Sequence, residues 1–184
     1  MQSEKRFRHS ENVSIESARL AKKFGENILK AKIAGILHDI TKEMPLKNQL
    51  QILDNNNIEL DNIQLEVNKL WHAISGSIYI KNFLNISDED IINAVRYHTT
   101  GKANMSLLEK IIFVADFTSM ERDFDGVSNI REATEKNNID FAVVKGLIYS
   151  LKNNIQQSKI LHPDTINAYN YILIDRKSIF NEQL

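Results

Sequence analysis

Apolar residues recur along most of the chain at intervals of three or four positions, which is the period of an α-helix that buries one face. Only two prolines and six glycines interrupt the 184 residues. The pattern therefore predicts an all-α domain. The expected helices cover residues 12–24, 28–41, 47–53, 66–83, 88–99, 107–117 and 140–157, followed by a last helix that starts at His162-Pro163.

Residues that commonly begin or end helices lie at many of these boundaries. The expected stop signals are Gly25, Pro45 and Gly101. The expected start signals are Ser87, the capping box Ser106-x-x-Glu109, and Pro163 at a first helical position. A polar loop is predicted for residues 119–128. We see no internal repeat or linker, so residues 1–184 are expected to form one domain.

The segment from Gly35 to Lys42 carries two different faces if it is helical. Ile33, Leu37, Ile40 and Met44 form an apolar stripe, and the residues roughly opposite are Gly35, His38, Asp39 and Lys42. A histidine followed by an aspartate is unusual within such an apolar pattern. We expect the apolar stripe to anchor the helix in the core and Gly35 to leave room beside the polar pair.

Composition excludes several classes of protein. With 23 basic and 24 acidic residues, no excess of positive charge favours nucleic acid or an anionic membrane. No apolar run approaches a membrane span, and the first residues lack a signal-peptide pattern. The absence of cysteine excludes disulfides and thiolate metal ligands. We expect a cytoplasmic protein.

Four of the five histidines have helical contexts and lie about 30 residues apart, at His9, His38, His72 and His98. A lone histidine is more often structural, but this spacing is that of one helix plus its connection, so all four side chains could point to one place. Asp116 directly follows the apolar run 111–115. A carboxylate in that position is expected to be buried and to need a cation.

Imidazole and carboxylate ligands without sulfur suit iron, manganese, cobalt or zinc. Such a metal would lower the pKa of a bound water and neutralise charge on a phosphorus centre. Arg6, Lys42 and Arg122 each lie within about two turns of a candidate ligand. Together they are typical of residues that hold a polyphosphate.

The ordered set of motifs resembles the superfamily of metal-dependent phosphohydrolases named for its His-Asp doublet. Within it, the chain is similar to the bacterial YqeK-type symmetrical diadenosine tetraphosphate hydrolases. The resemblance covers residues 6 to about 173. The segments that carry it are Arg6–Ser10, Leu37–Lys42, Trp71-His72, Arg96–Gly101, Met105–Asp116, Arg122–Phe124 and His162–Thr165.

The resemblance implies an HD-domain helical bundle, with a metal site between helices, that cleaves diadenosine tetraphosphate at its centre into two ADP. It implies that His9, His38, Asp39 and Asp116 hold the metal, for which iron is the first expectation and manganese or cobalt the alternatives. His38, Asp39 and Lys42 would be catalytic. His72 and His98 would complete a second metal site bridged by Asp39, or contact phosphate.

The resemblance also implies two groups of substrate contacts. Arg6, Lys42, Thr99 and Arg122 would hold phosphates. The nucleoside would lie under a segment made of Lys159, Ile160, Leu161, His162, Pro163 and Asp164, although His162-Pro163 serves equally well as a simple helix start. The residues 119–121 and Asp125 depart from the family's usual glycine- and proline-containing loop, which bears on the placement of Arg122.

Two other functions stay open from sequence. One is a phosphohydrolase of the same superfamily that acts on another nucleotide, such as a deoxynucleotide or guanosine tetraphosphate. The other is an inactive module that binds metal or nucleotide, against which the intact ligand set argues. The expected partners are a dinucleoside polyphosphate substrate and a nucleoside diphosphate product, without nucleic acid or membrane. The number of metal ions, one or two, and the oligomeric state, a homodimer included, are not determined.

Overall fold

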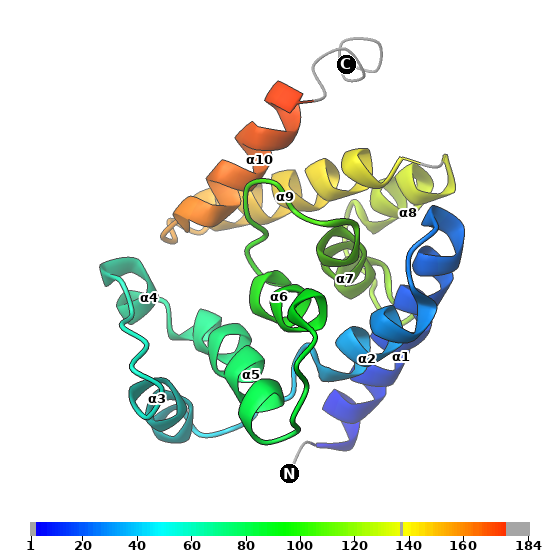
Figure 1. Cartoon of the computed structure of the whole chain (residues 1–184). Helices are drawn as coiled ribbons and strands as arrows, with labels where there is room; N and C mark the ends of the chain where they lie inside the picture. Colours follow the sequence, from blue (N-terminus) through cyan, green and yellow to red (C-terminus); the bar gives the residue numbers. More distant parts are fainter. Residues whose placement is uncertain (1–2, 137, 176–184) are drawn as a thin grey trace.

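The structure is a computed structural model that describes residues 3–136 and 138–175. Within these ranges it contains helices and connections but no strand, so the predicted all-α class is confirmed. Figure 1 shows the arrangement of the helices. Their bounds are α1 Glu4–Phe24, α2 Ile28–Leu37, α3 Leu46–Asp54, α4 Asn62–Glu66, η1 (a 3₁₀ turn) Asn68–Leu70, α5 Trp71–Asn82, α6 Glu89–Tyr97, α7 Leu107–Thr118, α8 Val127–Glu135, α9 Ile139–Gln156 and α10 Pro163–Asp175.

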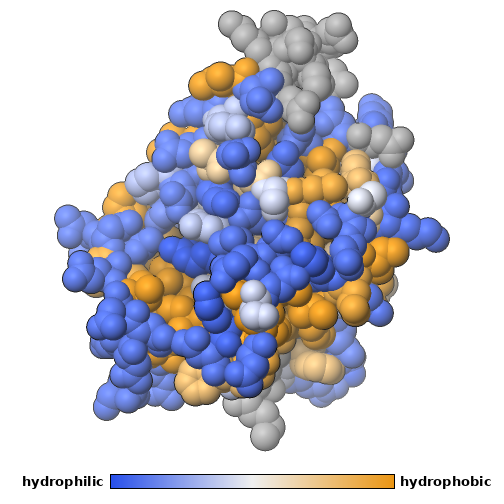
Figure 2. All heavy atoms as spheres, in the orientation of Figure 1, coloured by the Kyte–Doolittle hydropathy of each residue, from blue (hydrophilic) through white to orange (hydrophobic). Residues whose placement is uncertain are grey.

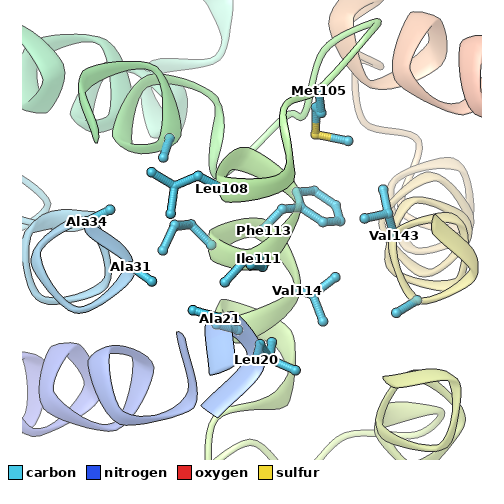
Figure 3. Packing of buried hydrophobic residues seen from close by; sticks show 14 of the residues in the cluster. Leu20, Ala21, Ala31, Ala34, Met105, Leu108, Ile111, Phe113, Val114 and Val143 are labelled. Carbon is cyan, nitrogen blue, oxygen red and sulfur yellow. The ribbon is translucent and has the colours of Figure 1, made fainter. Parts of the chain in front are cut away.

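Helix α7 forms the centre of the hydrophobic core. The apolar run that precedes Asp116, from Ile111 to Ala115, is completely buried. Side chains of α1, α2 and α9 surround it, among them Leu20, Ala34 and Val143 (Figure 3). Burial of each large aliphatic or aromatic side chain stabilises the fold by about 1.5–3 kcal/mol. The core therefore fixes the end of α7, where Asp116 lies.

Several predicted helix boundaries are confirmed. Ser106 and Glu109 form a reciprocal capping box at the start of α7. Gly25 ends α1 with φ of 80°, a conformation that favours glycine. Helix α6, by contrast, ends at Tyr97, two residues before its predicted end, and Gly101 N closes the turns that follow by donating to the Tyr97 carbonyl at 2.8 Å. Pro163 is the first residue of α10.

The prediction that the second helix continues to Thr41 was wrong. Helix α2 ends at Leu37, and residues 38–43 form a series of turns. The turns are closed by bonds from Ile40 N to the Leu37 carbonyl at 3.0 Å and from Lys42 N to the Asp39 carbonyl at 2.9 Å. These bonds span three residues rather than four, so the backbone is tighter than an α-helix. His38 and Asp39 are therefore held on turns just beyond a helix end.

The expected roles of the two faces around Gly35 also need correction. Ile33, Leu37 and Ile40 are only half-buried, whereas His38 and Asp39 are the buried residues. A Cβ atom at Gly35 would lie 2.8 Å from the Ser14 Cα atom, so glycine here lets α1 and α2 approach closely. Gly35 does not leave room for a ligand.

Other boundaries differ for local reasons. Helix α1 starts eight residues earlier than predicted, because the Ser3 hydroxyl accepts a bond from Arg6 N and caps it. The predicted helix over 66–83 is broken at Val67, and Asp88 rather than Ser87 caps α6. Helix α8 was not predicted, since it lies partly within the expected polar loop; its buried positions are Val127, Ile130, Ala133 and Thr134.

The outer surface carries both hydrophilic and hydrophobic residues. On the face shown in Figure 2 most residues are hydrophilic, and hydrophobic residues form separate patches. None of the helices among the described residues is long and apolar enough to cross a membrane.

Candidate metal centre and adjoining cleft

Four histidines and two aspartates from different parts of the chain meet at one point. Asp39 lies at the centre, and its two carboxylate oxygens face different partners. Oδ2 is 3.4 Å from His38 Nε2 and 3.8 Å from His9 Nε2. Oδ1 is 3.1 Å from His72 Nε2 and 3.4 Å from His98 Nε2. Asp116 Oδ1 lies next to the His9 and His38 rings, 3.1 Å from His9 Nε2.

Local backbone structure orients three of the four imidazole rings. His38 follows the last residue of α2, and His98 follows the last residue of α6. In each case the carbonyl three residues earlier belongs to the helix end, where carbonyls lack intrahelical partners. Nδ1–H of His38 donates to the Gly35 carbonyl and that of His98 to the Val95 carbonyl, both at 2.7 Å. His72 Nδ1 makes the same bond to the Lys69 carbonyl, also at 2.7 Å.

These bonds leave the Nε2 atoms with their lone pairs directed toward the centre, which is how histidine binds a metal. His38 Nε2 is buried and has no hydrogen-bond partner among the described residues. Nε2 atoms of His72 and His98 are only 3.1 Å apart, with Lys42 Nζ and the Thr99 hydroxyl beside them. Nitrogen and oxygen donors so arranged fit a divalent metal. Two sets of residues have their ligand atoms within 4.8 Å of one another and could each hold an ion. One set is His9, His38 and Asp116, and the other is His38, Asp39 and His98.

The pKa shifts differ among the histidines of the centre. Burial lowers the pKa of His72 to about 4 and also lowers the pKa of His98. Both rings are therefore neutral at pH 7. Burial alone would raise the pKa of Asp39, but His38 and the other imidazoles outweigh it and keep the pKa well below its usual range. For His38, burial would lower the pKa, yet Asp39 raises it overall, so a metal ion must compete with a proton there.

Three cationic side chains border the centre. Arg6 NH1 is 2.6 Å from Asp39 Oδ2, and Lys42 Nζ is 3.5 Å from Asp39 Oδ1. Arg122 Nε donates to the Asp116 carbonyl oxygen at 2.7 Å, and its NH2 contacts the Asp116 carboxylate. The unusual loop before Arg122 therefore still places this guanidinium at the centre. Addition of a divalent ion to these charges would leave the site positive overall.

A cleft of about 600 Å³ adjoins the histidine cluster at Thr99. One wall is formed by residues 66–70, around η1, and another by α9 and the segment before α10 (Figure 1). Tyr149 lines it, while its ring also packs against Phe124 with centroids 4.3 Å apart. The apolar side chains of Leu70, Leu151 and Ile160 line part of the cleft, and the amide side chains of Asn153 and Asn154 line another part. Such a mixture is typical of a small-molecule site.

The structure brings together most of the residues that the sequence singled out. His9, His38, Asp39, His72, His98 and Asp116 meet, and Arg6, Lys42, Thr99 and Arg122 surround them. Lys159, Ile160, Leu161 and His162 line the cleft, but Pro163 and Asp164 do not. His162 Nδ1 instead accepts a bond from Asp164 N at 3.2 Å, so these residues start α10. Sequence reasoning missed Tyr149 and Glu121 as parts of the site.

Comparison with known proteins identifies the family. The model of the HD domain matches residues 6–121, which contain all six histidine and aspartate residues of the centre. The chain belongs to the HD domain family. This confirms the resemblance seen in the sequence.

Relatives of this HD domain protein share nearly its whole length. The chain is 35% identical to "Bis(5'-nucleosyl)-tetraphosphatase, symmetrical" of Halalkalibacterium halodurans, over 95% of this chain and 92% of that one. It is 34% identical to the protein of the same name in Bacillus subtilis, over 92% and 90% of the two chains. A crystal structure of a predicted HD superfamily hydrolase from Clostridium acetobutylicum superposes with a TM-score of 0.91 at 37% identity, covering 95% and 92%.

Proposed function

We propose that this HD domain protein hydrolyses diadenosine tetraphosphate at the centre of its polyphosphate chain and releases two ADP. The observation that carries the proposal is the group of four imidazoles around Asp39, bordered by three cations and open to a cleft at Thr99. The full-length similarity to two symmetrical tetraphosphatases supports the choice of substrate. A metal-dependent phosphoanhydride hydrolase is the enzyme class that fits these features.

His9, His38, Asp39 and Asp116 are the proposed ligands of one divalent ion. His72 and His98, with the other oxygen of Asp39, are the proposed ligands of a second. The division of Asp39 Oδ2 and Oδ1 between two pairs of histidines supports the bridging role. Iron, which the family resemblance implies first, is our first choice of metal, with manganese and cobalt as alternatives. Imidazole and carboxylate ligands suit all three.

Arg6, Lys42, Thr99 and Arg122 are the proposed phosphate contacts. A substrate with four linked phosphates carries several negative charges, and guanidinium groups bind phosphate oxygens in pairs. The cleft would hold one nucleoside, with the ring of Tyr149 and the apolar side chains of Ile160 and Leu161 as its walls. Cytoplasmic location and a homodimeric state remain predictions.

The reaction adds one water to one phosphoanhydride. When bound, the metal supplies an activated water nucleophile and neutralises phosphate charge. The water oxygen forms a bond to one of the two central phosphorus atoms, and the bond from that phosphorus to the central bridging oxygen breaks. One ADP leaves with the bridging oxygen, the other keeps the water oxygen, and the protons of the water pass to the phosphate oxygens or to solvent. The chain's own cations stabilise the charge on the phosphate oxygens, which is where phosphoryl-transfer enzymes gain most of their rate. No side chain has to act as the nucleophile.

Product analysis tests the proposal directly. Purified protein loaded with iron, manganese or cobalt should convert diadenosine tetraphosphate to ADP alone, as measured by ion-exchange chromatography. Treatment with a chelator should remove the activity, and return of the metal should restore it. Formation of ATP and AMP would refute symmetrical cleavage. Lack of turnover of this substrate, with tight metal binding, would favour another nucleotide or a binding module.

Lys42 offers a separate test of the phosphate contacts. Replacement of Lys42 by methionine keeps most of the side-chain volume but removes the charge beside His72 and Asp39. We expect kcat/KM to fall roughly a hundredfold, because one charged contact to the transition state is worth a few kcal/mol. Metal content should stay at the wild-type value. Lys32 is exposed on α2, so the control variant Lys32→Met should have unchanged kinetics. Loss of the metal from the Lys42→Met protein would contradict the assignment of Lys42 as a phosphate contact.

A further inference from the structure

Glu121 is a carboxylate beside the metal centre to which no role has been given above. It lies in the loop between α7 and α8, and its Oε1 atom contacts Nδ1 of His9, 112 residues away in sequence. The Ser119 hydroxyl donates to the same oxygen at 3.0 Å, and Asn12 Nδ2 donates to Oε2 at 2.8 Å. The carboxylate is therefore held at both oxygens in one orientation.

The loop that carries Glu121 is itself well anchored. Arg131 of α8 donates to the Ser119 carbonyl at 3.0 Å and to the Arg122 carbonyl at 2.9 Å. Ser119 N in turn donates to the Ala115 carbonyl at 2.9 Å. Because these bonds lie on both sides of Glu121, its position relative to the end of α7 is fixed by the backbone.

His9 differs from the other histidines of the centre in its place on a helix. It lies inside the continuous helix α1, whereas His38 and His98 follow helix ends and His72 lies in a first turn. The carbonyl three residues before His9 belongs to Arg6 and serves the helix's own hydrogen bonds. His9 therefore needs an acceptor from elsewhere in the chain for its Nδ1–H.

The two ring nitrogens of His9 face in different directions. Nδ1 meets Glu121 at the outer side, and Nε2 lies 3.1 Å from Asp116 Oδ1 at the inner side. A carboxylate that accepts Nδ1–H fixes the tautomer and ring orientation of a ligating histidine and raises its basicity. We propose that Glu121 is a positioning residue that holds His9 as a metal ligand, an inference that rests on the metal centre of the proposed function.

Glu121 is about one-third exposed, so an ordinary surface ion pair is the competing explanation. The two explanations predict different effects on the metal. A surface pair would change the stability of the folded chain slightly and leave metal affinity unchanged. A positioning residue would change metal affinity even when the fold is intact.

The experiment is a titration of metal-stripped full-length protein with Co²⁺, followed by the visible absorption of the ion. We expect Glu121→Ala to raise the Kd of the tightest site roughly 10- to 100-fold. Glu121→Gln keeps an acceptor oxygen without the charge and should recover part of the affinity. Glu132→Ala removes an exposed carboxylate of α8 that pairs with Lys136, and should leave the Kd unchanged. Thermal unfolding of each metal-free variant reports on the fold.

A Kd for Glu121→Ala within twofold of the wild-type value would overturn the proposal. A second result would also overturn it: the metal-free Glu121→Ala protein has a lower Tm, and Glu121→Gln recovers none of the lost metal affinity. That combination would indicate a purely structural role. The titration uses no nucleotide. Failure of the wild-type protein to produce ADP would therefore refute the proposed reaction without bearing on Glu121.

Discussion

Replacement of Asp39 by alanine is expected to abolish both metal uptake and the turnover of diadenosine tetraphosphate. Asp39 lies within 4 Å of all four histidines of the centre and is almost completely buried. Loss of metal activation removes several kcal/mol of transition-state stabilisation, so the rate should fall by about a thousandfold or more. Metal content by atomic emission and ADP release by chromatography measure the two effects on the same sample.

The fold of this variant must be checked separately, because a buried charge is removed. Asp39→Asn keeps the shape of the side chain and should lose the metal as well, since an amide is a far poorer bridging ligand than a carboxylate. Asp125, which is exposed in the loop before α8, provides a matched control as Asp125→Ala with normal activity. Retained metal and turnover in a helical Asp39→Ala protein would refute the proposed centre.

Substitution of Gly35 by alanine should strongly destabilise the protein and disturb the same centre. The added Cβ atom would lie 2.8 Å from both the Ser14 Cα atom and the Ser17 hydroxyl, distances at which something must move. The backbone of α1 cannot yield locally, so α1 and α2 would separate. We expect a loss of about 1–3 kcal/mol in the free energy of unfolding, measured by urea denaturation. His9 and His38 lie on opposite sides of this contact, so metal affinity should fall too.

Gly76→Ala tests whether this effect is specific to the close approach of two helices. Gly76 lies within α5, and a Cβ atom there would meet no atom closer than 3.4 Å, the Thr41 hydroxyl. Alanine favours a helix by up to about 1 kcal/mol over glycine, so the variant should be as stable as the wild type or more so. Equal stability of Gly35→Ala and wild-type protein would show that the two helices can shift apart without cost.

Much of the site follows from residue chemistry that does not depend on the fold. Histidines recurring once per helix, a His-Asp doublet and an aspartate after a buried run are rare enough to indicate a metal centre, and all six residues do meet. The cations Arg6, Lys42 and Arg122 were found for a similar reason, since each lies close in sequence to a candidate ligand. Pro163 and Asp164 were assigned to the nucleoside by resemblance alone, and they do not line the cleft.

Glu121 was beyond the reach of sequence reasoning as a neighbour of His9. A glutamate in a polar loop has no periodicity or spacing that links it to a helix 112 residues earlier. Only the docking of the loop against α1, through Asn12, brings the two side chains together. Tyr149 was missed in the same way, because its ring contacts Phe124 and the cleft from within an otherwise ordinary amphipathic helix.

The sequence by itself determined that the chain is helical, where most helices begin and end, and which side chains could bind a metal. These properties depend on helical periodicity, capping residues and side-chain chemistry, all of which act locally. Only the tertiary structure decided that α2 stops at Leu37 and that Gly35 allows α1 and α2 to pack closely. It also decided that each oxygen of Asp39 faces its own pair of histidines. Those outcomes depend on contacts between segments far apart in the chain, which the helical spacing of apolar residues around 38–41 does not reveal.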